Sequence, residues 1–174
     1  YRRFHAELDS AEAIVAAAAA TPLEAPPGTR ERYSDLGMIL AMACVEAAAG
    51  EPFADFVQRE VFDRLGMTSA TFARRGSPID AVPTEVVAAR GGLVRGQVHD
   101  ENAQAMGGIS GHAGLFADAF DVTRLGQAFL AGAPGLSSPA LARSFVTRQD
   151  LVAGSSRAIG WDGFTPGGSG GSHL

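Results

Sequence analysis

A rigid turn followed a few residues later by an apolar helical run is the feature that most constrains how this chain can fold. Three prolines and a glycine lie within residues 22–28, and proline both fixes φ and lacks the N–H that a helix or strand needs. Apolar side chains then recur at helical spacing across residues 36–49. Tyr33 is therefore expected at the mouth of a buried helix, with Ser34 or Asp35 as the residue that caps it.

Other parts of the chain also show helical spacing. Periodicity and capping residues predict four more helices, over residues 11–21, 53–65, 121–130 and 138–147. Phe53, Phe56 and Phe62 are among the apolar residues of the second of these helices, which predicts that they belong to the core. Residues 68–96 are irregular and should form loops with one or two short strands, and residues 160–164 are typical of a further strand.

The composition indicates a globular domain or a large part of one. Hydrophobic residues make up 46% of the chain and charged residues 19%, which argues against a disordered polar chain. A helix that crosses a bilayer needs about 20 consecutive apolar residues, so the sequence predicts no transmembrane segment. The net charge of −5 and the scattered arginines argue against binding to nucleic acid, which depends on clustered positive charge.

The chain has one cysteine and no lysine. Cys44 lies among apolar residues and is predicted to be a small buried side chain, not a reactive thiol. A single cysteine excludes an internal disulfide and any metal site built from several cysteines. Because all 14 of the Lys and Arg residues are arginine, a mechanism that needs a lysine cannot be completed within these 174 residues.

Several short motifs occur in a characteristic order and spacing. They are Pro27-Gly28, Tyr33-Ser34-Asp35-x-Gly37, Glu46-x3-Gly50-x-Pro52-Phe53, Phe62-x2-Leu65-Gly66-Met67, Thr71-Phe72, His99-Asp100-Glu101-Asn102-Ala103 and Gly108-x-Ser110-Gly111-His112-Ala113-Gly114-Leu115-Phe116. Together they resemble the serine β-lactamase-related hydrolases, a family that includes class C β-lactamases, low-molecular-mass penicillin-binding proteins and related esterases. The resemblance extends over most of the chain.

The resemblance implies an α+β fold in which a helical region is inserted into a sheet-based domain. Residues 1–174 would be an internal part of one such domain, covering mainly the helical region and lacking much of the sheet. The family's Ser-x-x-Lys motif would precede residue 1, and its Lys-Thr-Gly or His-Thr-Gly strand motif would follow residue 174.

The resemblance also assigns roles to two residues near the turn. Tyr33 matches the tyrosine that serves the family as general base or proton relay for the nucleophilic serine, and Asp35 stands where the family usually has a substrate-binding asparagine. A phenol stays protonated at neutral pH unless cations stabilise its anion, and no sequence pattern places an arginine beside Tyr33. A carboxylate only accepts hydrogen bonds, which favours ester or peptide-type acyl transfer over β-lactam hydrolysis.

A second segment that is rich in glycine, residues 98–116, also contains several side chains that can form hydrogen bonds. Glycine permits positive φ and close backbone approach, so we expect a shaped loop that forms one wall of the substrate cleft, with Ser110 and His112 as substrate-binding residues. Ser110 resembles the serine of a Gly-x-Ser-x-Gly nucleophile elbow, but His112 replaces the second glycine, which argues against that role. His99 and His112 together with nearby carboxylates could suit zinc, although their irregular spacing favours a loop held by hydrogen bonds and no metal site.

The predicted function is that of a serine hydrolase acting through an acyl-enzyme on a β-lactam, a D-Ala-D-Ala-type peptide or an ester. The 174 residues by themselves are expected to be inactive. Two alternatives stay open: an inactive member of the fold that binds peptidoglycan or a partner protein, and a metal-dependent hydrolase that uses His99 and His112. The resemblance implies no cofactor, a small-molecule or peptidoglycan-derived substrate, and a periplasmic or secreted location, while the oligomeric state stays open.

Overall fold

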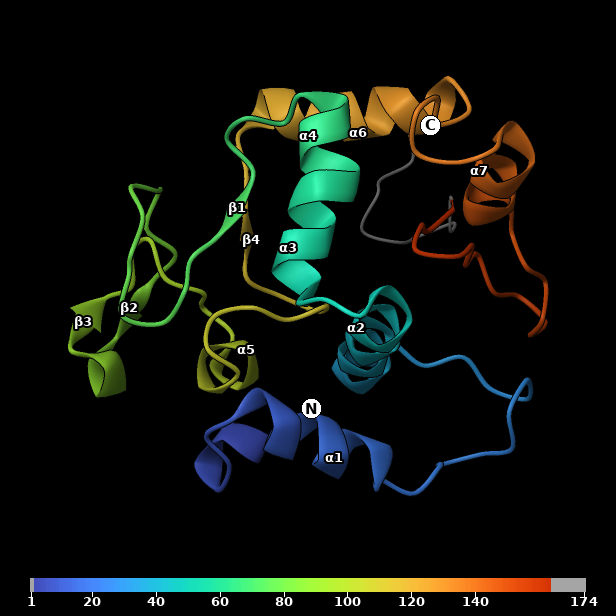
Figure 1. Cartoon of the computed structure of the whole chain (residues 1–174). Coiled ribbons are helices and arrows are strands. Elements are labelled where there is room, and N and C mark those ends of the chain that lie inside the picture. Colours follow the sequence, from blue (N-terminus) through green and yellow to red (C-terminus); the bar gives the residue numbers. More distant parts are fainter. Residues whose placement is uncertain (1, 164–174) are drawn as a thin grey trace. The chain divides into compact units, whose positions relative to one another are not determined.

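The computed structural model describes residues 2–163, which group into two compact units (Figure 1). The first unit comprises Tyr1–Pro22 and Ser34–Val122, and the second comprises Leu23–Tyr33 and Thr123–Leu174. The described part of the chain is largely helical, and each of its strands is two residues long.

The first unit carries most of the regular structure. Its elements are a 3₁₀ turn (Phe4–Ala6), α1 (Ala11–Ala19), α2 (Asp35–Ala49), α3 (Phe53–Val57), a π-helical turn (Gln58–Phe62), α4 (Asp63–Leu65), β1 (Thr71–Phe72), β2 (Val86–Val87), a second 3₁₀ turn (Ala88–Arg90), β3 (Gly92–Leu93), α5 (Glu101–Ala105) and β4 (Leu115–Phe116). Strand β1 pairs antiparallel with β4, and β2 pairs antiparallel with β3. Residues 68–96 form loops with three short strands, β1, β2 and β3, which is one strand more than the one or two predicted for that segment.

The core of the first unit lies where α1, α2 and α5 pack together. It is formed by six buried side chains, which are Ile14, Ala18, Ile39, Met42, Ala105 and Met106. Cys44, in contrast, is exposed, so the prediction that it is buried is wrong. At 100° per residue, Cys44 points away from the side of α2 on which Ile39 and Met42 are buried.

The helix predicted over residues 53–65 is interrupted in its middle. Residues Gln58–Phe62 form a π-helical turn between α3 and α4. Val57 and Phe62 are five residues apart, which is the i→i+5 spacing of a π turn. Phe62 is buried, while Phe53 and Phe56 are half-buried. The predicted core role is therefore confirmed fully for Phe62 and in part for the other two phenylalanines.

The helix predicted to open at Asp121 begins two residues earlier, as α6 (Ala119–Leu130). Asp118 takes the capping role, because its side chain accepts a hydrogen bond from the Asp121 amide at 2.8 Å. Asp121 is buried, and its carboxylate accepts hydrogen bonds from Ser69 N and Ser69 Oγ, both at 2.7 Å, and from Ala70 N at 3.1 Å. The buried carboxylate thus ties the first turn of α6 to the loop that precedes β1.

The second unit contains α7 (Pro139–Val146) and a small aromatic cluster. Ser138 caps α7 by accepting a hydrogen bond from Leu141 N at 3.2 Å, and the helix predicted over residues 138–147 is confirmed. The ring of Phe129 lies 5.2 Å from Trp161 and 6.3 Å from Phe145, measured between centroids. The predicted strand 160–164 is reduced to one bridge between residues 157 and 162 in the described range, and its last residue lies outside that range.

No single helix among residues 2–163 is long and apolar enough to cross a bilayer. Only α2 and the segment Phe53–Leu65, taken together as a pair bent by 78°, meet that length and composition.

Candidate functional site

Tyr33 lies directly before α2, and 79% of its surface is exposed. The next residue, Ser34, is the N-cap of α2 and has extended backbone, but its side chain makes no capping hydrogen bond. The prediction that Ser34 or Asp35 caps this helix is therefore confirmed for the position of Ser34, although the Ser34 side chain makes no capping hydrogen bond. Asp35 is the first residue of α2, where a negative charge is favourable for the helix dipole.

An arginine of the second unit stands over the ring of Tyr33. The guanidinium carbon of Arg157 is 5.7 Å from the ring centroid, which is within cation–π range. Arg157 Nε donates a hydrogen bond to Glu31 Oε1 at 3.2 Å, and Arg157 Nη2 lies 3.5 Å from Asp162 Oδ2. The sequence pattern did not predict this neighbour, because Arg157 comes from a distant segment of the chain.

Ser110 and His112 are brought together in the first unit, and Asp100 completes a chain of hydrogen bonds. His112 Nδ1 is 2.8 Å from Ser110 Oγ, and His112 Nε2 is 2.8 Å from Asp100 Oδ1. A carboxylate can only accept, so in the neutral imidazole Nε2–H donates to Asp100 and Nδ1 accepts from the Ser110 hydroxyl. The arrangement is chemically that of a Ser-His-Asp relay, but only 3% of Ser110 and 3% of the His112 side chain are exposed.

The glycines of this loop allow it to pack tightly against its neighbours. A Cβ on Gly111 would lie 2.3 Å from the Met38 carbonyl oxygen of α2. A Cβ on Gly108, where φ is +91°, would lie 2.2 Å from the Ala73 carbonyl oxygen. The prediction of a shaped loop is therefore confirmed for residues 106–114, which rest directly on α2, whereas residues 101–105 form the helix α5 and residues 115–116 the strand β4, neither of which was predicted.

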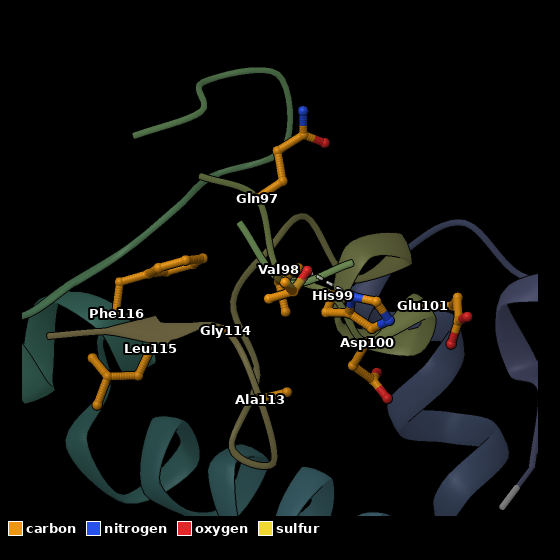
Figure 2. Close-up of a pocket in the computed structure, with 10 residues that line it drawn as sticks. Gln97, Val98, His99, Asp100, Glu101, Ala113, Gly114, Leu115 and Phe116 are labelled. Carbon is orange, nitrogen blue, oxygen red and sulfur yellow. Dashed lines mark hydrogen bonds between the residues drawn. The ribbon is translucent and has the colours of Figure 1, made fainter. Parts of the chain in front are cut away.

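A hollow of about 520 Å³ is lined by the two ends of this segment, residues 97–101 and 113–116 (Figure 2). Figure 2 shows Leu115 and Phe116 on one side, with His99, Asp100 and Glu101 on the other. The hollow thus combines an apolar flank with a polar flank. Asp100, whose side chain is 22% exposed, connects it to the buried Ser110–His112 pair.

The carboxyl group of Asp100 is held in its ionised form. Burial raises its pKa, but hydrogen bonds from the His112 side chain and from the Ala103 and Asn102 amides outweigh burial and lower the pKa below its ordinary value. Asp100 Oδ1 accepts from Ala103 N at 2.8 Å, so the same carboxylate also caps α5. Ionised Asp100 therefore fixes the imidazole of His112 and the start of α5 together.

This arrangement predicts a pH-dependent contribution to stability. Because the pKa of Asp100 is lower in the folded state than in the unfolded chain, its ionised carboxylate stabilises the fold at pH values above its ordinary pKa near 3.9. This contribution is lost as the pH falls below that value and through the lowered pKa of the folded state. We expect Asp100→Asn to lower the free energy of unfolding by about 1–2 kcal/mol at pH 7, since asparagine still caps a helix but lacks the charge. In urea unfolding, this difference should shrink below about pH 4.

The matched control is Asp80→Asn, because Asp80 is 91% exposed and pairs with Arg95 at the surface. An exposed pair contributes little, so this variant should show a much smaller difference at every pH. A loss of stability in Asp100→Asn that stays constant from pH 7 to pH 3 would contradict the role assigned to the Asp100 charge.

His99 and His112 do not come together in the described residues as the metal site that was one of the alternatives. Within residues 2–163, no three His, Cys, Asp or Glu side chains gather closely enough to hold a metal ion. Both ring nitrogens of His112 have protein partners, while His99 Nδ1 is 2.8 Å from Thr84 Oγ1 and His99 Nε2 is 3.5 Å from Glu85 Oε1. The geometry favours a loop held by hydrogen bonds.

Comparison with known proteins identifies the family. The family model described as Beta-lactamase matches residues 1–172. A protein of Escherichia coli K12 named "Putative D-alanyl-D-alanine carboxypeptidase" is 36% identical over 127 residues, which cover 64% of this chain and 29% of that protein. The chain therefore spans about 29% of the length of the curated relatives that it matches.

Solved structures show the same fold at lower sequence identity. The penicillin-binding protein from Bacillus halodurans superposes with a TM-score of 0.64 at 20% identity, covering 82% of this chain and 42% of that one. The D-stereospecific amidohydrolase from Streptomyces superposes with a TM-score of 0.62 at 21% identity, covering 83% of this chain and 42% of that one. The predicted α+β fold class, represented here mainly by its helices, is confirmed, and the chain belongs to the Beta-lactamase family of serine hydrolases.

Proposed function

We propose that the full-length protein is a serine hydrolase that works through an acyl-enzyme, with Tyr33 moving the proton. The observation that carries this proposal is the family match over residues 1–172, within which Tyr33 lies at the head of α2. The buried Ser110 is not suited to attack a substrate. Because these 174 residues contain no lysine, the Ser-x-x-Lys motif with the nucleophilic serine would come from another part of the protein. This part of the domain by itself would then be inactive.

The proposed reaction has two steps. The serine oxygen attacks the substrate carbonyl carbon, the bond to the leaving group breaks, and the proton from the serine passes through Tyr33 to the leaving amine or alcohol. Water then attacks the carbonyl carbon of the acyl-enzyme, the ester bond to the serine oxygen breaks, and the proton from that water passes through Tyr33 to the serine oxygen, which releases the acid. Tyr33 is suited to this exchange because its exposed side chain can reach a bound substrate.

The hollow beside residues 98–116 supports the proposed substrate wall. Leu115 and Phe116 would contact an apolar part of the substrate, while Asp100 would accept a hydrogen bond from a polar part. The nearly buried Ser110 and His112 would hold this wall from behind instead of lying on its surface. Asp35, at the start of α2, would accept a hydrogen bond from the substrate amide.

The proposed substrate class is a peptide that ends in D-Ala-D-Ala. The name of the relative at 36% identity supports this choice, as does the D-stereospecificity in the name of a structural neighbour. The full-length protein should release D-alanine from such a peptide and leave the matching L-Ala-L-Ala peptide intact, as measured by chromatography of the products.

Two results of this experiment would overturn the proposal. Tight binding of the D-Ala-D-Ala peptide without any turnover, together with no hydrolysis of nitrophenyl esters, would identify an inactive binding protein. Turnover that is abolished by a chelator and restored by zinc would identify the metal-dependent alternative.

A further inference from the structure

Tyr33 is exposed to solvent over most of its surface and has a fixed charged group over its ring. An exposed aromatic side chain that lacks a fixed neighbour samples several rotamers. The guanidinium of Arg157 supplies a planar neighbour, at 5.7 Å from the ring centroid. A flat cation over a flat ring favours the orientation in which the two groups face each other.

Arg157 is itself held at both ends. Its guanidinium binds Glu31 on one side and approaches Asp162 on the other. Its backbone carbonyl accepts a hydrogen bond from Gln149 N at 3.0 Å, and its amide donates to Ser155 Oγ at 3.1 Å. Both the side chain and the backbone of Arg157 are therefore held by hydrogen bonds, which limits where its guanidinium can lie relative to Tyr33.

The second carboxylate of this network is fixed as well. Ser156 Oγ donates to Asp162 Oδ1 at 2.6 Å, and residues 157 and 162 form a backbone bridge. Asp162 is thus held where it can pair with Arg157. All of these groups belong to the second unit, as does Tyr33.

The charges of this network decide what Arg157 can do. One guanidinium faces two carboxylates, Glu31 and Asp162, so the group as a whole carries no excess of positive charge. Arg157 therefore cannot replace the lysine that the chain lacks as a source of positive potential for a tyrosine anion. Arg157 would therefore act on Tyr33 by orienting the ring through its planar shape and position, and not by stabilising a negative charge on the phenol.

We propose that Arg157 is a positioning residue that fixes the ring of Tyr33 for proton transfer, through a guanidinium plane braced by Glu31 and Asp162. This inference rests on the proposed role of Tyr33 in catalysis. A reacting group that is misplaced by about 1 Å can lose a factor of about 10² in rate, so the brace has a measurable consequence.

The test compares Arg157→Gln and Arg157→Lys in the full-length protein, with the D-Ala-D-Ala peptide as substrate. Both variants should lower kcat by about 10- to 100-fold with KM changed by less than about twofold, because the orientation of Tyr33 is lost while substrate contacts stay. Lysine should not rescue, since it keeps the charge and lacks the planar fork. Glu31→Gln, which leaves Arg157 in place but weakens its brace, should give a smaller loss of kcat.

The matched control is Arg143→Gln, because Arg143 is an exposed arginine of α7 and should leave kcat unchanged. If Tyr33→Phe loses activity but Arg157→Gln keeps the wild-type kcat, or Arg157→Lys restores it fully, the inference about Arg157 is overturned and the proposed function is not. If the Arg157 variants failed to fold, a wild-type kcat in Glu31→Gln would overturn it. Full activity of Tyr33→Phe would instead overturn the proposed function, and this inference with it.

Discussion

Phenylalanine in place of Tyr33 is expected to lower the kcat of the full-length protein by about 10²- to 10⁴-fold, the usual contribution of a positioned general acid or base. The substitution removes only the phenolic oxygen, so the ring that faces Arg157 is kept. Because the side chain is 79% exposed, the protein should be as stable as the wild type. Steady-state kinetics and thermal unfolding of the same preparations measure both effects.

The chain has only two tyrosines, so Tyr1→Phe is the matched control, and it should leave kcat unchanged. A fall of less than twofold in Tyr33→Phe, at unchanged stability, would show that the hydroxyl takes no part in proton transfer. Loss of activity that accompanies a lower melting temperature would indicate a structural role instead, and would equally contradict the assignment.

Alanine in place of Gly108 should destabilise the protein by about 3–5 kcal/mol. Gly108 has φ of +91°, where a side chain adds strain, and its Cβ would lie 2.2 Å from the Ala73 carbonyl oxygen. Neither backbone can move freely, because Arg75 N donates to Gly107 O at 2.8 Å and Gly108 N donates to Ala103 O at 2.9 Å. Urea unfolding monitored by circular dichroism gives the change.

Gly107→Ala is the control that separates the cost of backbone strain from the cost of the steric clash between a Cβ at position 108 and the Ala73 carbonyl oxygen. Gly107 has nearly the same φ, +90°, but a Cβ there would meet no heavy atom within 4 Å. We therefore expect a loss of only about 1–2 kcal/mol, which is the cost of an unfavourable backbone conformation alone. Equal destabilisation by the two substitutions would contradict the close packing assigned to the loop.

Local sequence signals predicted the helices well because the information lies within each segment. The helix over residues 36–49 and its end at Gly50 follow from apolar spacing and from a residue that accepts the left-handed conformation. The same signals failed at Cys44, whose neighbours are apolar although its own side of α2 is exposed. They also missed the π turn at Gln58–Phe62, because the spacing of apolar residues in this segment does not distinguish a π turn from a regular α-helix.

The site was less predictable because its parts come together over long stretches of chain. Glu31 and Arg157 are 126 residues apart, so no pattern of local spacing could place a guanidinium over Tyr33. Ser110 and His112 were identified as residues of one loop, but their link to Asp100 and their burial depend on how that loop packs. Tertiary packing, not residue type, thus decides which of these side chains can contact a ligand.

The most direct test of the account is the intact mass of the full-length protein during turnover of a slowly released acyl donor, such as a β-lactam or an activated ester. We predict a mass increase equal to the acyl group, which peptide mapping places on a serine outside residues 1–174, and which forms much more slowly in Tyr33→Phe. An unmodified mass during turnover, or an acyl group on Ser110, would contradict the account.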